Sequence, residues 1–559
     1  MRRLASKEIA DTMDKIEELS IRDDDNSIRA QCRQLMMTYL IEYPLGKKMS
    51  KHFDFYISNL SYEEETGRIS SLEMFAVMFN KFPFTVLQEY STYFFIPLVM
   101  MLINDESALC KKMAASAVKL LITKLGAGSP RNDLFDITLN WSKQNKVQLR
   151  QVAMQLFGTF VDVEQDTFNN DNFKTRLDQM VPILLKTIQD GVKADQDDDE
   201  SSEDESEAED NENEAENNIN EDSEDHDGAV QIKKLPMNDK CLYNTLTCVG
   251  KIFTKIPGIF TTGADYKINE FLAAITELLL HSHAWVRLSS SQLFAVYFSS
   301  IPVEEISNTS SNSYLSIDTQ AKVKDLCLIF YEQLKDDQLT KEIADQATKN
   351  LIYLFKIVKY LNVGELNSKA VSNNNAIGDT EILHDDEEIQ NPKKNITIKV
   401  LIVKMTRLAT FEALKKIKES VKRTCVFRWI AAVCLDSDHQ QLLPHLPDLL
   451  KPLYREISNA QKEESDLVKL AHEVLELIRG QFDKQTFAEV YAKVQKMAHE
   501  KRDSRKRKLA VEAVKEPEKF AARKQKLNLA KREQKKRKLY ERKPELKFKK
   551  IRSQKATDE

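Results

Sequence analysis

Clustered lysines and arginines near the C-terminus are the residues of this chain best suited to a chemical task. Residues 501–559 hold 24 basic and 9 acidic residues, with the cations gathered in three groups. Cations at this density neutralise phosphates of a nucleic acid and release its counterions, which gives salt-dependent binding with little base specificity. A nuclear-import signal is the simpler interpretation, but import needs only one short cluster. We therefore predict RNA contact, with or without import. The predicted contact residues are Arg505, Lys506, Arg507, Lys508, Arg523, Lys524, Lys526, Lys535, Lys536, Arg537 and Lys538.

An acidic segment carries the opposite charge. Residues 195–227 contain 19 acidic residues and no Lys or Arg, although the whole chain has a formal net charge of only −5. Self-repulsion and few apolar residues leave nothing to offset the entropy of ordering, so we expect disorder across residues 193–228. Four consecutive carboxylates at 197–200 could hold a divalent cation weakly, but a solvated run is the simpler interpretation. Acidophilic kinases favour serines with an acidic residue three positions later, and the candidate phosphorylation sites are Ser201, Ser202 and Ser206.

Sequence motifs of the common enzyme classes are missing. The sequence has no glycine-rich phosphate loop, no HExxH, no paired CxxC and no GxSxG. His281 and His283 resemble half of a metal site, but two residues apart on a helix they would point to different faces. A helix-end or core role is the expected one. We predict no enzyme, no metal site, no cofactor and no small-molecule substrate.

Six segments outside the acidic and basic regions follow one short sequence rule. An apolar residue precedes Lys or Arg, a small residue follows the apolar one by four positions, and another core residue follows it by seven. These positions share one face of a helix, and the small residue lets a partner helix approach closely. The copies are Ile28-Arg29 with Cys32 and Leu35, a looser Gly67-Arg68 with Ser71 and Met74, Cys110-Lys111 with Ala114 and Ala117, Leu149-Arg150 with Ala153 and Leu156, Val286-Arg287 with Ser290 and Leu293, and Phe427-Arg428 with Ala431 and Cys434.

The spacing of the copies predicts the architecture. The first four begin 39, 43 and 39 residues apart, which is the period of HEAT-type helix pairs that bury their apolar faces only by stacking. One copy could arise by chance in any amphipathic helix, but four at this spacing could not. We predict an all-α solenoid with a basic helical tail. The expected parts are solenoid at 1–192, the acidic insertion at 193–228, solenoid at 229–361, a polar disordered insertion at 362–395, solenoid at 396–484 and the tail at 485–559.

Cysteine usage and hydropathy bear on the compartment. Seven scattered cysteines, an odd number within apolar helical windows, indicate buried free thiols in a reducing environment. Nothing approaches 18 uninterrupted apolar residues, and the start has no apolar signal region, so we expect neither secretion nor a membrane span. Met1 falls inside the helical periodicity rather than in a polar capping repeat, so the chain is expected to be the C-terminal part of a longer protein.

Three stretches resemble the C-terminal region of the "down-regulated in metastasis" family. They lie at 43–83, 94–121 and 283–298, and the most specific parts are the Tyr-Pro-Leu-Gly turn at 43–46 and the Glu-Thr-Gly-Arg run at 65–68. Members are very large HEAT-repeat proteins of the small-subunit processome, associated with the U-three small nucleolar RNA. The resemblance implies a nucleolar, non-enzymatic scaffold needed to process pre-ribosomal RNA to small-subunit rRNA. Its implied partners are pre-ribosomal RNA, small nucleolar ribonucleoprotein and other processome proteins.

A different class, the importin-like transport carrier, is also an α-solenoid and could hold basic cargo with an acidic loop. The basic tail argues against this alternative, because the tail would compete for the acidic groove of its own chain.

Overall fold

The computed structural model describes most of the chain. The described residues are 7–164, 171–204, 237–256, 258–260, 266–301, 319–336, 339–369, 397–414, 420–459 and 466–515, with isolated positions up to 532. Within these residues every regular element is a helix and none is a strand, so the predicted all-α class is confirmed. None of the described helices is long and apolar enough to cross a bilayer.

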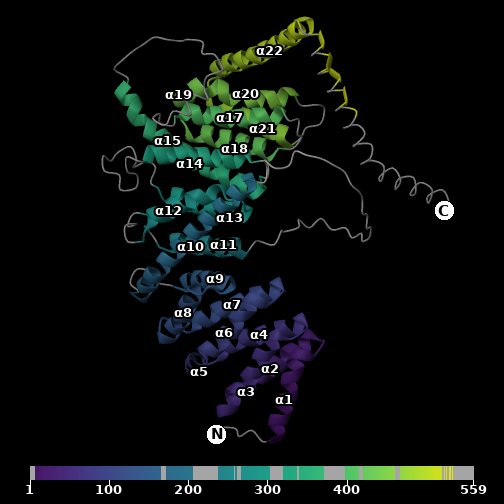
Figure 1. Ribbon diagram of the computed structural model, residues 1–559, viewed down its shortest axis with the longest axis vertical. Coiled ribbons are helices and arrows are strands. Elements are labelled where there is room, and N and C mark those ends of the chain that lie inside the picture. Colours follow the sequence, from purple (N-terminus) through teal and green to yellow (C-terminus); the bar gives the residue numbers. More distant parts are fainter. Residues whose placement is uncertain are drawn as a thin grey trace, which may run out of the picture. The chain divides into compact units, whose positions relative to one another are not determined.

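The chain divides into two compact units, and the first comprises Met1–Leu408 and Ser420–Val433. Its helices pack as consecutive antiparallel pairs, and the second helix of each pair also packs on the second helix of the next (Figure 1). The pairs are α1 (Lys7–Arg22) with α2 (Asn26–Glu42), α3 (Met49–Ser58) with α4 (Glu65–Lys81), α6 (Ser91–Asn104) with α7 (Ala108–Lys124), α8 (Ser129–Ser142) with α9 (Val147–Val163), α10 (Asp171–Asp204) with α11 (Met237–Lys255), α12 (Ile268–Glu277) with α13 (Ala284–Ser300), and α14 (Thr319–Lys335) with α15 (Lys341–Lys369). A short helix, α5 (Phe84–Glu89), precedes α6.

The repeated rule marks where the second helix of a pair begins. In α2, α4, α7, α9 and α13 the rule starts at the third residue, so its basic residue is always the fourth. The small residues lie in the packed interface as predicted: Ala114, Ala153, Ser71 and Ser290 are each fully buried. A side chain at Gly67 would collide with the ring of Tyr62 and approach Ile21 of α1. The pattern therefore describes the surface that each pair presents to the pair before it.

The first copy of the rule departs from the predicted core. Ile28 is 41% exposed and Leu35 is 49% exposed, while Cys32 is half-buried. The corresponding Cys110 and Ala117 of α7 are buried. The difference arises because this face of a second helix packs on the preceding pair, and no pair precedes α1 and α2 among the described residues.

The last copy is out of register with its helix. Helix α18 (Val421–Asp436) begins six residues before Phe427, so Arg428 is not its fourth residue. The Arg428 side chain is half exposed, and its Nη1 lies 2.9 Å from Asp345 Oδ1 of α15. Phe427 and Cys434 are nevertheless buried. The prediction of core positions was right here, but the assignment to the repeat was wrong.

Two predicted insertions begin later than expected. Helix α10 runs through residue 193 to Asp204, because neither Pro nor Gly interrupts the chain between Val192 and that residue. Helix α15 likewise extends past residue 361 to Lys369. Residues 205–228 and 370–395 lie outside the described residues.

The second unit comprises Ala409–Glu419 and Cys434–Glu559. Its helices are α19 (His439–Leu442), α20 (Leu446–Asn459), α21 (Asp466–Gln481) and α22 (Lys484–Lys515), while α17 (Ile398–Leu414) and α18 are divided between the units. Helices α21 and α22 both pack on α20. Helix α22 spans the predicted tail boundary at 485, and its first turns pack on α20.

Candidate nucleic-acid interface

Helix α22 joins a packed base to an exposed basic end. At the base, Phe487 and Val494 are buried, and the Phe487 and Tyr491 rings stack 5.8 Å apart at 12°. Tyr491 also meets Tyr454 of α20 edge-to-face at 5.8 Å. These apolar contacts fix the direction in which the rest of the helix extends.

The exposed end of α22 presents cations. Lys506, Arg507 and Lys508 are all exposed. Arg502 donates through Nη2 to Ser458 Oγ and Asn459 Oδ1, both at 3.3 Å, which ties the helix to the end of α20. Helix α22 is described as far as Lys515, and Pro517 and Glu518 beyond it are also helical.

The predicted RNA contacts are only partly described by the structure. Arg505 lies in α22, although its side chain is outside the described set, and Lys524 is an exposed helical residue. Ser201 and Ser202 lie in the last turns of α10, so they are helical rather than in a disordered segment. The predicted residues that lie outside the described part are Ser206, Arg523, Lys526, Lys535, Lys536, Arg537 and Lys538.

Three repeat arginines have a role that sequence reasoning missed. Arg68 Nη1 donates to the carbonyl oxygens of Tyr62 and Glu63, at 2.9 and 2.8 Å. Arg29 makes the same contacts with the carbonyls six and five residues before it, at 2.5 and 3.2 Å, and Arg287 does so at 2.7 and 2.8 Å. Each guanidinium therefore closes the turn between the two helices of its own pair. The constant spacing between turn and arginine is the sequence signal that could have revealed this.

Two of these arginines also reach the next helix pair. Arg68 Nε lies 2.9 Å from Asp105 Oδ2, whose side chain is 4% exposed. Arg287 Nη2 lies 3.4 Å from Asp336 Oδ2. Both basic residues therefore meet a carboxylate in the next helix pair. These arginines are structural and are not available to a ligand.

The histidine pair also has a structural role. His283 is the N-cap of α13 and accepts a hydrogen bond from the Trp285 amide at 3.2 Å, while buried His281 accepts one from the His283 amide at 3.0 Å. The expected helix-end role is confirmed.

Asp14, Glu17 and His52 form a cluster of possible metal ligands that sequence reasoning missed. Their donor atoms lie within 4.8 Å of one another. His52 Nδ1 is 2.9 Å from Glu17 Oε1, and Lys51 Nζ is 2.9 Å from Asp14 Oδ2. Burial raises the pKa of the Glu17 carboxyl. Because Lys51 already places a cation on Asp14, we interpret the group as an ion-paired link between α1 and α3.

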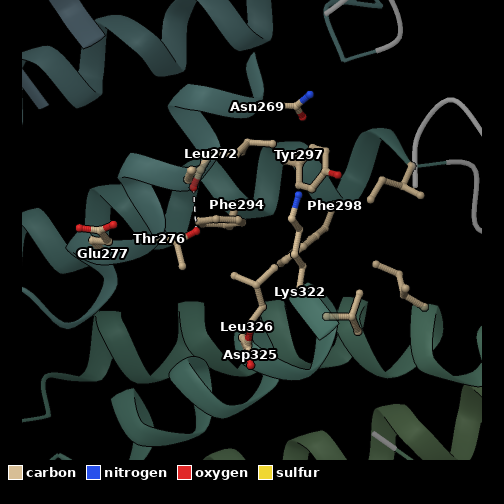
Figure 2. Close-up of a pocket in the computed structure, with 14 residues that line it drawn as sticks. Asn269, Leu272, Thr276, Glu277, Phe294, Tyr297, Phe298, Lys322, Asp325 and Leu326 are labelled. Carbon is tan, nitrogen blue, oxygen red and sulfur yellow. Dashed lines mark hydrogen bonds between the residues drawn. The ribbon is translucent and has the colours of Figure 1, made fainter. Parts of the chain in front are cut away.

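A cavity of about 350 Å³ lies between α12 and α14, over α13 (Figure 2). Phe294, Tyr297 and Phe298 line it, and Thr276 Oγ1 donates to the Leu272 carbonyl at 2.7 Å. Burial raises the pKa of the Tyr297 hydroxyl. Its described lining combines these rings with polar and charged side chains, among them Thr276, Lys322 and Asp325.

Comparisons with known proteins agree on one family. The family model described as "Small subunit processome component 20 homolog, C-terminal" matches residues 230–541, which is more than half of the chain. "U3 small nucleolar RNA-associated protein 20" of Schizosaccharomyces pombe is 26% identical over 92% of this chain, and that of Saccharomyces cerevisiae is 20% identical over 95%. The chain spans 18% of the length of each of these relatives.

Solved structures show similarity only at the level of helical architecture. The crystal structure of Kap121p is 12% identical, with 84% of this chain and 46% of that chain covered and a TM-score of 0.34. Similarity this low carries no information on function.

Proposed function

Because the chain belongs to the small subunit processome component 20 homolog C-terminal family, we propose that it is a non-enzymatic scaffold of ribosome assembly in the nucleolus. In this role it binds pre-ribosomal RNA and assembly factors and is needed to process pre-ribosomal RNA toward small-subunit rRNA. The name of its relatives, which associates them with the U3 small nucleolar RNA, supports the RNA part of the proposal.

The single structural observation that carries the proposal is the exposed basic end of α22. A helix anchored by Phe487 and Val494 holds Lys506, Arg507 and Lys508 away from the packed unit. Such cations contact phosphates without needing a shaped pocket. Stacked helix pairs meanwhile offer long surfaces for protein partners. This combination fits a scaffold that holds RNA and proteins together.

The test replaces Lys506, Arg507 and Lys508 with Gln in the full chain and measures binding of single-stranded RNA over a salt series. Loss of three phosphate contacts lowers the slope of log affinity against log salt by about 2. The matched control replaces three exposed lysines of the first unit, Lys47, Lys48 and Lys81, with Gln.

Deletion of residues 501–559 provides the cellular arm of the same test. We expect circular dichroism to show that the remaining helices stay folded, and we expect the shortened chain to be lost from the fractions that contain large pre-ribosomal particles. An unchanged salt slope together with unchanged co-sedimentation would overturn the proposed role of the tail.

A further inference from the structure

A second row of cations lies on the first unit, away from α22 in the sequence. Lys111, Arg150 and Lys240 are the fourth residues of α7, α9 and α11, three consecutive second helices that pack side by side. This is the position that carries a turn-closing arginine in α2, α4 and α13. Lys240 was not found by the sequence rule because Asp239, rather than an apolar residue, precedes it.

These three cations do not donate hydrogen bonds to turn carbonyls as the turn-closing arginines do. Within the described part of the chain, no side-chain hydrogen bond or ion pair engages Lys111, Arg150 or Lys240. Lys240 is exposed, and the other two side chains are half-buried. Their charges are therefore available to a ligand.

At the opposite ends of the same three helices, the lysines are paired with a carboxylate. Asp162 of α9 places Oδ2 2.8 Å from Lys251 Nζ of α11 and 3.5 Å from Lys119 Nζ of α7. One carboxylate thus bridges cations from both neighbouring helices. At the row no carboxylate does this. Burial, and secondarily the charge of Lys111, lowers the pKa of Lys240, so the two ammonium groups feel each other.

Further charges surround the row. Exposed lysines add to the positive potential, namely Lys112 at the start of α7 and Lys143 and Lys146 before α9. Two carboxylates lie nearby in the sequence. Glu106 is exposed, and Asp239 is half-buried with its Oδ1 3.9 Å from His281 Nε2.

The acidic segment leaves the solenoid beside the same row. Gly191 of α10 lies against Leu242 of α11, two residues after Lys240. Helix α10 then continues to Asp204 through residues that are mostly acidic. Helix α10, which leads into the acidic segment, therefore packs on the helix that carries Lys240.

An exposed aromatic residue adjoins the row. Trp285, the second residue of α13, is 43% exposed, and its ring centroid lies 6.3 Å from that of Tyr243. Tyr243 is three residues after Lys240, so the two share one side of α11. Aromatic faces beside cations bind unpaired nucleobases by stacking while the cations hold the backbone. An acidic protein segment would use the cations but not the indole.

We propose that Lys111, Arg150 and Lys240, with Trp285 as a stacking platform, form a second RNA-binding surface that takes a single-stranded stretch. The inference rests on the proposed function and deepens it, because it places RNA on the solenoid as well as on the tail. One cation per helix pair spaces the backbone contacts along the strand. One nucleobase unstacks from its neighbouring bases and stacks on the Trp285 indole ring.

The test uses the full chain with its tail intact and fluorescein-labelled oligouridine as the probe. The row variant carries Lys111→Gln, Arg150→Gln and Lys240→Gln, and the Lys47, Lys48 and Lys81 triple variant is again the charge-matched control. We expect the salt slope of the row variant to fall by about 2 and that of the control to stay unchanged. Circular dichroism melting confirms that each variant is folded.

Trp285→Ala and Trp285→Phe separate stacking from charge. The Ala variant loses affinity for oligouridine about tenfold, while the Phe variant keeps most of it, because both aromatic rings offer a stacking face.

Three outcomes would overturn the inference. A row variant with an unchanged slope, while the α22 variant loses its own, refutes the second surface and leaves the proposed function standing. Equal losses in row and control variants mean that only net charge matters. A row variant that loses binding to polyglutamate but not to oligouridine shows that the partner is an acidic protein segment.

Discussion

The fourth residue of a second helix is a turn-closing arginine in some helix pairs and an unengaged cation in others. This difference gives a testable prediction. Arg68 and Arg150 are both the fourth residue of a second helix, and the same change to Gln removes the guanidinium from each while keeping most of the stem. Arg68→Gln breaks the ion pair with Asp105 and two bonds to turn carbonyls. Arg150→Gln breaks no side-chain contact within the described residues.

The magnitude follows from the burial of Asp105. Removing one partner of a buried ion pair costs about 3–5 kcal/mol, because the remaining charge stays desolvated. Asp105 keeps one bond, from the Ser107 amide at 2.7 Å, and the Arg68 side chain is 16% exposed, so the lower part of that range applies. We expect Arg68→Gln to lower the free energy of unfolding by about 3 kcal/mol. Arg150→Gln should change it by no more than about 0.5 kcal/mol.

Urea unfolding followed by circular dichroism gives the global values, and hydrogen exchange of residues 62–68 reports the turn itself. The local probe is needed because stacked repeats can open one pair at a time. Faster exchange in this turn for Arg68→Gln, with none for Arg150→Gln, would agree with the structure. Equal destabilisation by the two variants would refute the distinction between turn-closing and free cations.

Three further predictions follow from burial and charge. Ala114→Leu places a larger side chain in a fully buried interface and should destabilise by about 1–3 kcal/mol in urea unfolding; Lys112→Leu on the same helix, which is exposed, should not. Burial raises the pKa of Cys248 to about 12 from an ordinary value near 9, so this thiol contributes stability that is complete below pH 9 and is lost as pH rises toward 12. Cys248→Ala should therefore lose less stability than the wild type between pH 8 and pH 10.5, and an identical loss would contradict this account. Replacing the acidic residues of 205–227 with Ser and Gly should tighten oligouridine binding, because these residues follow α10, which packs on the helix of Lys240, and their charge competes with RNA for cations; unchanged affinity would show that they do not affect the row.

Much of the fold could be predicted because the same sequence pattern recurs in several helix pairs and marks the residues that pack between them. The small residues Ala114 and Ala153 lie where the rule requires close helix approach, and both are fully buried. Ile28 and Leu35 obey the same rule but are exposed, since burial depends on a neighbouring pair that a local pattern cannot guarantee. Helix ends were the weakest predictions, as α10 shows, because an acidic composition disfavours compaction without preventing a helix.

The candidate sites were predictable to a smaller extent. A dense run of cations such as 505–508 is visible in any sequence, and α22 presents three of those four side chains to solvent. The row formed by Lys111, Arg150 and Lys240 is dispersed over 130 residues and is assembled only by stacking. Sequence also could not separate Arg68 from Arg150, because the difference lies in which carbonyls and carboxylates come within reach.

Ultraviolet crosslinking in cells, followed by sequencing of the attached RNA and mass spectrometry of the attached peptides, tests the scaffold proposal most directly. We expect reads from pre-ribosomal RNA, with crosslinked peptides from residues 501–559 and from the starts of α7, α9, α11 and α13. Recovery of transport factors and their cargo, without pre-ribosomal RNA, would contradict the proposal and favour a carrier.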